Sequence, residues 1–138
     1  MVGQVRTDGH GQLCALCTHA GAIELCTPAQ SQWCQTEDHQ FFALAHFDLL
    51  GSGSDAILAC AYDGFTMILD ARQHGVCFDF AHEVFAFTAG RYATRRGHNE
   101  PCLFYMAFGG KLHVFYQLDM TSLELRTLAV SQKEEEEE

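Results

Sequence analysis

The sequence predicts an all-β protein made of four-stranded antiparallel β-propeller blades, and three observations support this fold class. A pattern of apolar run, glycine-containing turn and second apolar run occurs in residues 13–25, 56–69 and 102–116. The turns recur at intervals of about 45 residues, which is the length of one propeller blade. Further short apolar runs lie between these segments. The pattern therefore indicates three hairpins, with extra strands that complete them to blades.

The individual strands are predicted from the alternation of apolar residues with other residues. In the second hairpin, for example, Met67 and Leu69 occupy alternate positions, which is the period of a β-strand. A blade then consists of an inner strand, a hairpin and an outer strand. The strands expected between the hairpins are 33–34, 41–47, 76–80 and 84–90.

Glycine marks the turn of each predicted hairpin. The turns contain Gly21, Gly64 and Gly110, and two of them have the dipeptides Asp63-Gly64 and Gly109-Gly110. These dipeptides are typical of two-residue primed hairpin turns. Such turns need positive φ angles, which glycine adopts without steric strain. We therefore expect positive φ at these glycines.

The predicted strands add up to about two and a half blades, an incomplete propeller. Propellers typically have about four to eight blades, and an open stack leaves strand edges unpaired. The blade repeats are expected over residues 13–118, so we expect a fragment, an isoform or a piece that needs a partner. Residues 1–12 are expected to be disordered or to form part of a strand. Residues 119–138 are expected to form a weak helix followed by a disordered acidic tail.

Composition excludes several function classes. The formal net charge is -10, with Glu134–Glu138 supplying five of the acidic residues. An acidic chain does not attract nucleic acid or anionic lipid. No stretch approaches the roughly 20 apolar residues of a membrane span, and no secretory signal is visible. Seven cysteines without such a signal indicate reduced thiols in a cytoplasmic protein.

Two segments resemble a known family. The first contains Phe42-Ala-Leu-Ala-His-Phe-Asp-Leu-Leu-Gly and, further on, Tyr62-Asp-Gly-Phe. The second contains Ala86-Phe-Thr-Ala-Gly-Arg-Tyr-Ala followed by Gly97-His-Asn-Glu-Pro-Cys-Leu-Phe-Tyr. The first segment resembles an FG-GAP repeat. In order, both are similar to the C-terminal blades of the integrin-alpha FG-GAP repeat-containing family. The resemblance covers roughly residues 13–117.

This resemblance implies a function as well as a fold. It implies a seven-bladed propeller in the full-length protein and membership of KICSTOR, a lysosome-associated scaffold complex. In that family the protein pairs with kaptin, and the complex restrains target-of-rapamycin signalling when amino acids are scarce. We therefore expect a non-enzymatic interaction scaffold without cofactors. It would be cytoplasmic and recruited to the lysosomal surface, with kaptin and other KICSTOR subunits as partners.

The resemblance also raises the question of calcium. An FG-GAP calcium loop supplies oxygen ligands at its first, third, fifth and ninth positions, and calcium prefers several carboxylates among its ligands. Here these positions hold Asp48, Leu50, Ser52 and Ala56, while Asp55 lies one place before the last. With carboxylates at Asp48 and Asp55 alone, and only the first in place, the loop is predicted to be metal-free.

Zinc and catalysis are disfavoured by similar arguments. Cys14, Cys17, His19 and Cys26 offer zinc-ligand chemistry. However, they lie on a predicted hairpin, where strand residues three apart point to opposite faces, so core cysteines are expected. No nucleophile elbow and no phosphate-binding loop that opens a helix is present. We therefore expect no enzyme activity.

A basic cluster is the main candidate for partner contacts. Arg91, Arg95 and Arg96 lie in a predicted loop between two strands of an otherwise acidic chain. Loops carry binding function more often than core strands do, and the alternative interpretation is a solvated loop without a partner. Two alternatives to the scaffold stay open: an integrin-like, calcium-dependent interaction module, and a truncated product without function.

Overall fold

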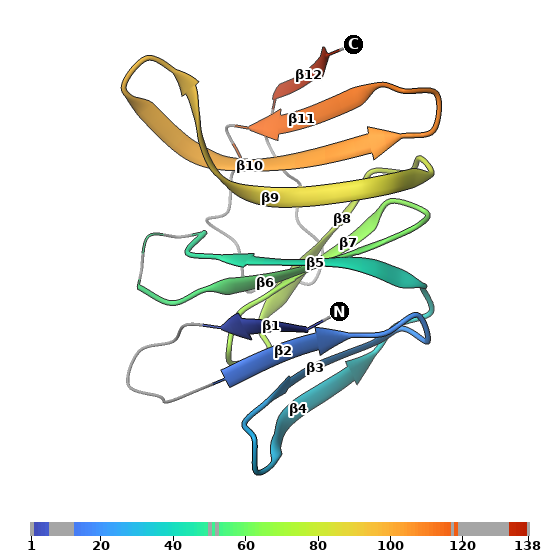
Figure 1. The fold of residues 1–138 in the computed structure, drawn as a ribbon, viewed down its shortest axis with the longest axis vertical. Helices are drawn as coiled ribbons and strands as arrows, with labels where there is room; N and C mark the ends of the chain where they lie inside the picture. The colour runs from blue at the N-terminus through green and yellow to red at the C-terminus, as the bar shows by residue number, and fades with distance from the viewer. Residues whose placement is uncertain are drawn as a thin grey trace.

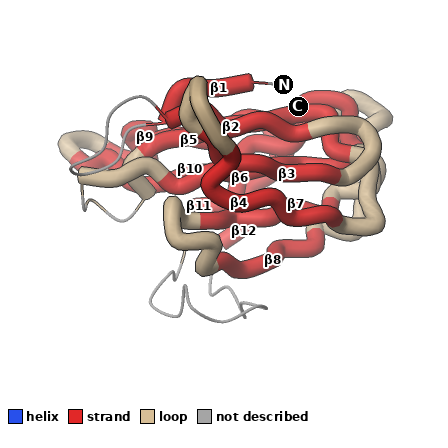
Figure 2. Tube along the Cα trace, turned by 90° about the horizontal axis from the view of Figure 1, so that it is seen from below, coloured by secondary structure: helices blue, strands red, loops and turns tan. Residues whose placement is uncertain are grey.

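The computed structural model describes residues 2–5, 13–49, 51, 53–116, 118 and 133–137. Every regular element in these residues is a β-strand, as Figure 2 shows. Within the same residues, no helical segment has the length and apolar character of a membrane span. The helix expected near residues 120–130 lies outside the described residues.

The strands form three four-stranded sheets, and strands that follow one another in sequence are neighbours in each sheet. We call the sheets blades 1, 2 and 3. Blade 1 contains β1 (Val2–Val5), β2 (Leu13–Cys17), β3 (Ala22–Cys26) and β4 (Ser31–Thr36). Blade 2 contains β5 (Phe41–Phe47), β6 (Ala56–Ala61), β7 (Phe65–Leu69) and β8 (Gly75–Asp79). Blade 3 contains β9 (Val84–Arg95), β10 (His98–Ala107), β11 (Leu112–Tyr116) and β12 (Lys133–Glu137).

The arrangement of the blades confirms the predicted fold class. All strand pairs are antiparallel. The blades are stacked one on another, and their first strands β1, β5 and β9 lie side by side without closing into a ring (Figure 1). These are the four-stranded antiparallel repeats of propeller-like blades.

One end of the chain agrees with the sequence-based expectation and the other differs from it. Val2–Val5 pair with β2, which is the partial strand that was one of the two expectations for residues 1–12. Lys133–Glu137 pair with β11, although a disordered acidic tail was expected there. The physical reason is that a ladder uses backbone groups, so the edge of β11 can be paired whatever the side chains are. As a result there are three four-stranded sheets in place of two and a half blades.

Blade 2 is the most deeply buried sheet because it lies between the other two. All six residues of β6 are buried, whereas β2 alternates between buried and half-buried residues. A strand covered on both faces tolerates apolar residues at every position. This explains why residues 56–61 are apolar without interruption.

Two groups of side chains hold the blades together. Between blades 1 and 2, Ile23, Phe41 and Met67 are buried in one cluster. Trp33 reinforces this contact, because its Nε1 donates a hydrogen bond to the Ala71 carbonyl at 2.9 Å. The second group lies between blades 2 and 3. Its aromatic members are Phe78, Phe80, Phe87, Tyr105 and Phe115. The core therefore runs through the whole stack.

The hairpin turns confirm the expected positive φ but correct the turn type. Gly21, Gly64 and Gly110 have φ of 96°, 91° and 87°. In the second hairpin, the Gly64 amide donates to the Ala61 carbonyl at 3.0 Å, which places Tyr62 and Asp63 at the centre of the turn. Gly64 then follows as a third loop residue. This three-residue loop with a left-handed glycine is a common alternative to the primed two-residue turn, because it also matches strand twist.

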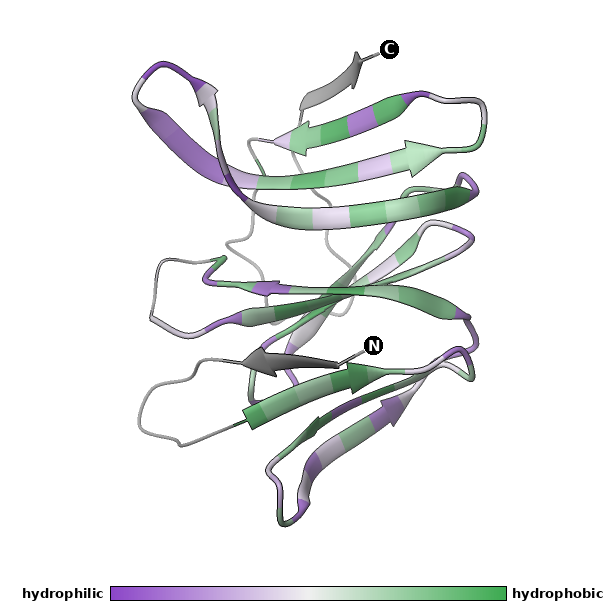
Figure 3. Ribbon diagram, viewed as in Figure 1, coloured by the Kyte–Doolittle hydropathy of each residue, from purple (hydrophilic) through white to green (hydrophobic). Residues whose placement is uncertain are grey.

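Most strands contain many apolar residues, and hydrophilic residues are concentrated at a few places (Figure 3). Figure 3 shows hydrophilic residues gathered at the far end of the hairpin formed by β9 and β10. In Figure 1 this end bends away from blade 2 and extends past the end of β11. It contains the basic cluster that the sequence singles out.

Candidate protein-interaction surface

The hairpin of β9 and β10 is longer than its counterpart in blade 2. β9 and β10 contain 12 and 10 residues, whereas β5 and β6 contain 7 and 6. All nine residues from 91 to 99 are exposed. We call residues 91–99 the tip. The extra length carries the tip out of the stack and into solvent.

A buried carboxylate fixes the shape of the tip. Glu100 is buried at its base. The Thr94 hydroxyl donates to Glu100 Oε2 at 2.6 Å, and His98 Nε2 lies 3.1 Å from the same oxygen. Both strands remain paired up to Arg95 and His98. Strand pairing and the Glu100 contacts therefore give the tip a defined conformation.

Arg91 connects the tip to blade 2. Its Nε donates to the Asp48 carbonyl at 3.1 Å, and its NH2 group donates to the Leu49 carbonyl at 3.1 Å. Both carbonyls belong to the loop between β5 and β6. Of the three arginines predicted as partner contacts, Arg91 thus has a structural role within the chain.

Arg95 and Arg96 are placed differently. Both are exposed at the end of the tip. Within the part of the chain that the structure describes, neither side chain has an ion pair or a hydrogen bond. Residues 91–99 include no aspartate or glutamate. The two guanidinium groups therefore present positive charge to solvent.

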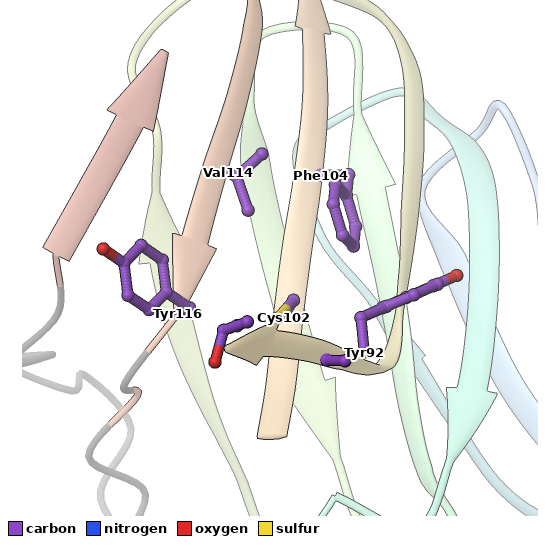
Figure 4. Close-up of a pocket in the computed structure, with 7 residues that line it drawn as sticks. Tyr92, Cys102, Phe104, Val114 and Tyr116 are labelled. Carbon is purple, nitrogen blue, oxygen red and sulfur yellow. The ribbon is translucent and has the colours of Figure 1, made fainter. Parts of the chain in front are cut away.

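A small pocket lies beside the tip on the outer face of blade 3. Its volume is about 170 Å³, and Figure 4 shows the end of β9 crossing β10 at its side. The lining residues are Tyr92, Ala93, Thr94, Cys102, Phe104, Val114 and Tyr116. Metabolite sites usually have volumes of about 300–1,000 Å³. The pocket is therefore too small for a typical metabolite and has the size of a single side chain.

Sequence reasoning missed this pocket because it is built from three strands. Phe104 lies directly opposite Val114 in the register of β10 and β11. Tyr92 reaches the same place from β9, with its ring 4.8 Å from that of Phe104 in an edge-to-face arrangement. Alternation within β10 and β11 would place Phe104 and Val114 on one face once the pairing was known. Tyr92 is paired with Glu100 in the register of β9 and β10, and its ring lies against Gly90, so its contribution also requires the pairing of these two strands.

The loop that resembles a calcium site does not fit calcium. Asp48 Oδ2 accepts a hydrogen bond from the Gly53 amide at 2.8 Å, and Asp55 Oδ2 lies 3.0 Å from His46 Nδ1. The Arg91 guanidinium binds two carbonyls of this loop and places a positive charge there. A cation in the same place would be repelled. No cluster of three or more metal-ligating side chains occurs in the described residues.

We therefore expect that calcium does not bind. Isothermal titration with calcium chloride should give no saturable heat, and the melting temperature should be the same with calcium and with chelator. An Arg91→Ala variant serves as the control, because it removes the positive charge and leaves both carboxylates. A dissociation constant below roughly 0.1 mM for the unaltered chain would contradict this expectation.

The cysteines that suggest a zinc site are divided between two faces of blade 1. Cys17 is buried, and its Sγ lies 4.0 Å from the Ala43 carbonyl. Cys14 lies on the opposite face, where it is the direct cross-strand neighbour of Cys26. His19 lies in the turn, in edge-to-face contact with Tyr62. The four residues therefore do not surround a common point.

Four of the buried or half-buried thiols are poorly suited to nucleophilic catalysis. Burial raises the pKa of Cys60 to about 12. Burial likewise raises the pKa of Cys17, Cys77 and Cys102. A thiol with a raised pKa stays protonated at neutral pH and is a poor nucleophile. This favours packing roles for these side chains.

Comparison with known proteins gives consistent matches. The family model described as integrin-alpha FG-GAP repeat-containing protein 2 matches residues 1–120. KICSTOR complex protein ITFG2 from Mus musculus is 36% identical over 134 residues, which cover 93% of this chain and 30% of that protein. KICSTOR complex protein ITFG2 from Bos taurus is 38% identical over 117 residues, which cover 84% of this chain and 22% of that protein. The chain thus spans less than a third of either relative. No solved structure matches it significantly.

Proposed function

Since the chain belongs to the integrin-alpha FG-GAP repeat-containing protein 2 family, we propose that it is a non-enzymatic scaffold subunit of a KICSTOR-type complex. In this role it binds protein partners in the cytoplasm and is recruited with them to the lysosomal surface. The complex would restrain target-of-rapamycin signalling when amino acids are scarce. We propose kaptin as the first partner, together with other KICSTOR subunits.

One observation carries this proposal. The two relatives that match 93% and 84% of the chain are both named as proteins of the KICSTOR complex. The geometry supports the same class of function. A single-side-chain pocket next to two exposed arginines suits a protein contact better than a metabolite site. The integrin-like alternative is disfavoured, because Arg91 occupies the loop that would hold calcium.

The test is capture of the chain by tagged kaptin when both are co-expressed, with the soluble yield recorded. We expect stoichiometric capture, and none with the tag alone. A full-length relative serves as the positive control. If kaptin captures the relative and leaves a soluble, folded form of this chain behind, the proposal is wrong for this chain. If the chain is insoluble while the relative is captured, the alternative of a truncated product without function is supported.

A further inference from the structure

The tip concentrates positive charge in an acidic molecule. Three of the eight lysine and arginine residues lie within residues 91–96, although the whole chain has a net charge of -10. Arg91 is engaged with the β5–β6 loop, whereas Arg95 and Arg96 have no ion pair with any residue in the described ranges. A ligand that approaches the tip itself is therefore selected for negative charge, while the acidic residues elsewhere, including those of β12 next to β11, repel it.

The chemistry of the two side chains narrows the kind of anion. Guanidinium groups donate planar, paired hydrogen bonds that match the geometry of a carboxylate or a phosphate. A nucleic acid or a charged membrane would need many basic contacts over a wide area, because its affinity comes from several neutralised phosphates. Two free arginines on a chain of net charge -10 do not provide such an area. Carboxylates of a protein segment fit the tip better.

The pocket supplies the second element of recognition. Its wall includes Tyr92, Ala93 and Thr94 of the strand that continues directly to Arg95. Since a strand rises about 3.4 Å per residue, Arg95 lies roughly 7 Å along the chain from Ala93. One apolar side chain of a ligand can enter the pocket while carboxylates two or three residues away reach the arginines. In protein interfaces, side chains that enter a pocket and arginines near it are among the residues that contribute most of the binding energy.

The site is also ordered before any ligand binds. The strands of the tip are paired up to the turn at residues 96–97, and Glu100 holds Thr94 and His98 at its base. Arg91 fixes it to blade 2 through the Asp48 and Leu49 carbonyls. A pre-formed site avoids the entropy loss of ordering a loop on binding.

From these observations we propose that the tip and the adjacent pocket bind an acidic protein segment that has one bulky apolar residue. The residue enters the pocket lined by Tyr92, Phe104 and Val114, and neighbouring Asp or Glu side chains pair with Arg95 and Arg96. The inference deepens the proposed scaffold function and rests on it for the biological setting. The binding chemistry itself is tested without any KICSTOR subunit.

The experiment uses labelled synthetic peptides of about nine residues and fluorescence anisotropy with the whole chain. The test peptides have a central Phe, Trp or Leu flanked by Glu and Asp. Control peptides have Lys in place of the acids, or Ala in place of the central residue. We expect the acidic, anchored peptides to bind at least about tenfold more tightly than either control, and added salt should weaken them.

Variants of the chain localise the binding. Arg95→Glu and Arg96→Glu should each weaken the binding of the acidic peptides. The double variant should weaken this binding at least about tenfold. Arg72→Glu makes the same charge change in an exposed turn of blade 2 and should leave binding unchanged. Val114→Phe, which fills the pocket from a half-buried position, should weaken anchored peptides and leave the folded state intact. Melting curves of all variants check folding.

Three outcomes overturn the inference. The first is that acidic peptides bind no better than their Lys counterparts. The second is that Arg72→Glu weakens binding as much as the tip variants do. The third is binding of single-stranded RNA or phosphatidylserine vesicles through Arg95 and Arg96 without peptide binding. Kaptin capture remains a separate readout: capture without peptide binding refutes only this inference, and peptide binding without capture refutes only the proposed kaptin contact.

Discussion

Replacing Tyr105 with alanine is expected to lower the free energy of unfolding by about 3–5 kcal/mol, the range for removing a large buried aromatic side chain. Tyr105 is fully buried on β10. Its ring stacks on Phe80 of blade 2 with centroids 4.6 Å apart, and Phe87 lies at 5.0 Å. The substitution therefore leaves a cavity at the contact between blades 2 and 3.

The hydroxyl of Tyr105 adds a hydrogen bond to this contact. It lies 2.6 Å from Thr66 Oγ1, and the Thr66 hydroxyl in turn donates to the Gly64 carbonyl at 3.2 Å. The Tyr105 hydroxyl is therefore the donor in the first bond. Burial raises the pKa of Tyr105 well above its usual value, so the donor proton is retained. The chain of bonds links β10 to the turn of the second hairpin.

Urea denaturation of three variants separates these contributions. Tyr105→Ala should show the full loss, whereas Tyr105→Phe keeps the ring and should lose about 1 kcal/mol for the missing hydrogen bond. Phe108→Ala removes an aromatic ring that is 63% exposed, and the effect should stay within about 0.5 kcal/mol. Equal losses for Tyr105→Ala and Phe108→Ala would show that the aromatic contact does not hold the blades together.

Replacing Gly64 with alanine is expected to lower the free energy of unfolding by at least about 2 kcal/mol, because two unfavourable effects add at this position. The residue has φ of 91°, a conformation that strains a residue with a side chain. In addition, a Cβ at this position would lie 2.6 Å from the His82 carbonyl oxygen, so the backbone would have to move. His82 lies in the link between blades 2 and 3, which makes the turn part of the blade contact.

A second glycine with positive φ separates the backbone strain from the steric contact with the His82 carbonyl oxygen. Gly97 in the tip has φ of 71°, and a Cβ there would meet nothing within 4 Å. Gly97→Ala should therefore lower the free energy of unfolding only by the cost of the backbone strain, about 1–2 kcal/mol. Thermal and urea unfolding of both variants give the difference. If Gly64→Ala costs no more than Gly97→Ala, the contact with His82 places no constraint on the turn.

Much of the fold can be predicted from the sequence because hairpins depend on local signals. The alternation around Met67 and Leu69 and the glycine at position 64 predict a hairpin, and the structure has β6 and β7 there. The uninterrupted run of residues 56–61 matches a strand buried on both faces. The turn type was predicted incorrectly, since a glycine with positive φ suits both the primed turn and the three-residue loop.

The candidate site is less visible in the sequence. The charge of the tip arginines is visible in the sequence, but the difference between their roles is not. Arg91 contacts carbonyls of residues more than 40 positions earlier in the chain, at 3.1 Å, and only the stacking of blades 2 and 3 brings them together. The pocket likewise requires the register that sets Phe104 opposite Val114 and the pairing of β9 with β10 that brings Tyr92 beside them.

By itself, the sequence determined the class of strands, the repeat and the acidic balance, because periodicity, glycine and charge act locally along the chain. The tertiary structure alone decided that Lys133–Glu137 pair with β11, that Arg91 serves the β5–β6 loop, and that a pocket lies beside Arg95 and Arg96. These features depend on contacts between residues distant in sequence. Such contacts are set by how sheets pair and stack, which no local pattern specifies.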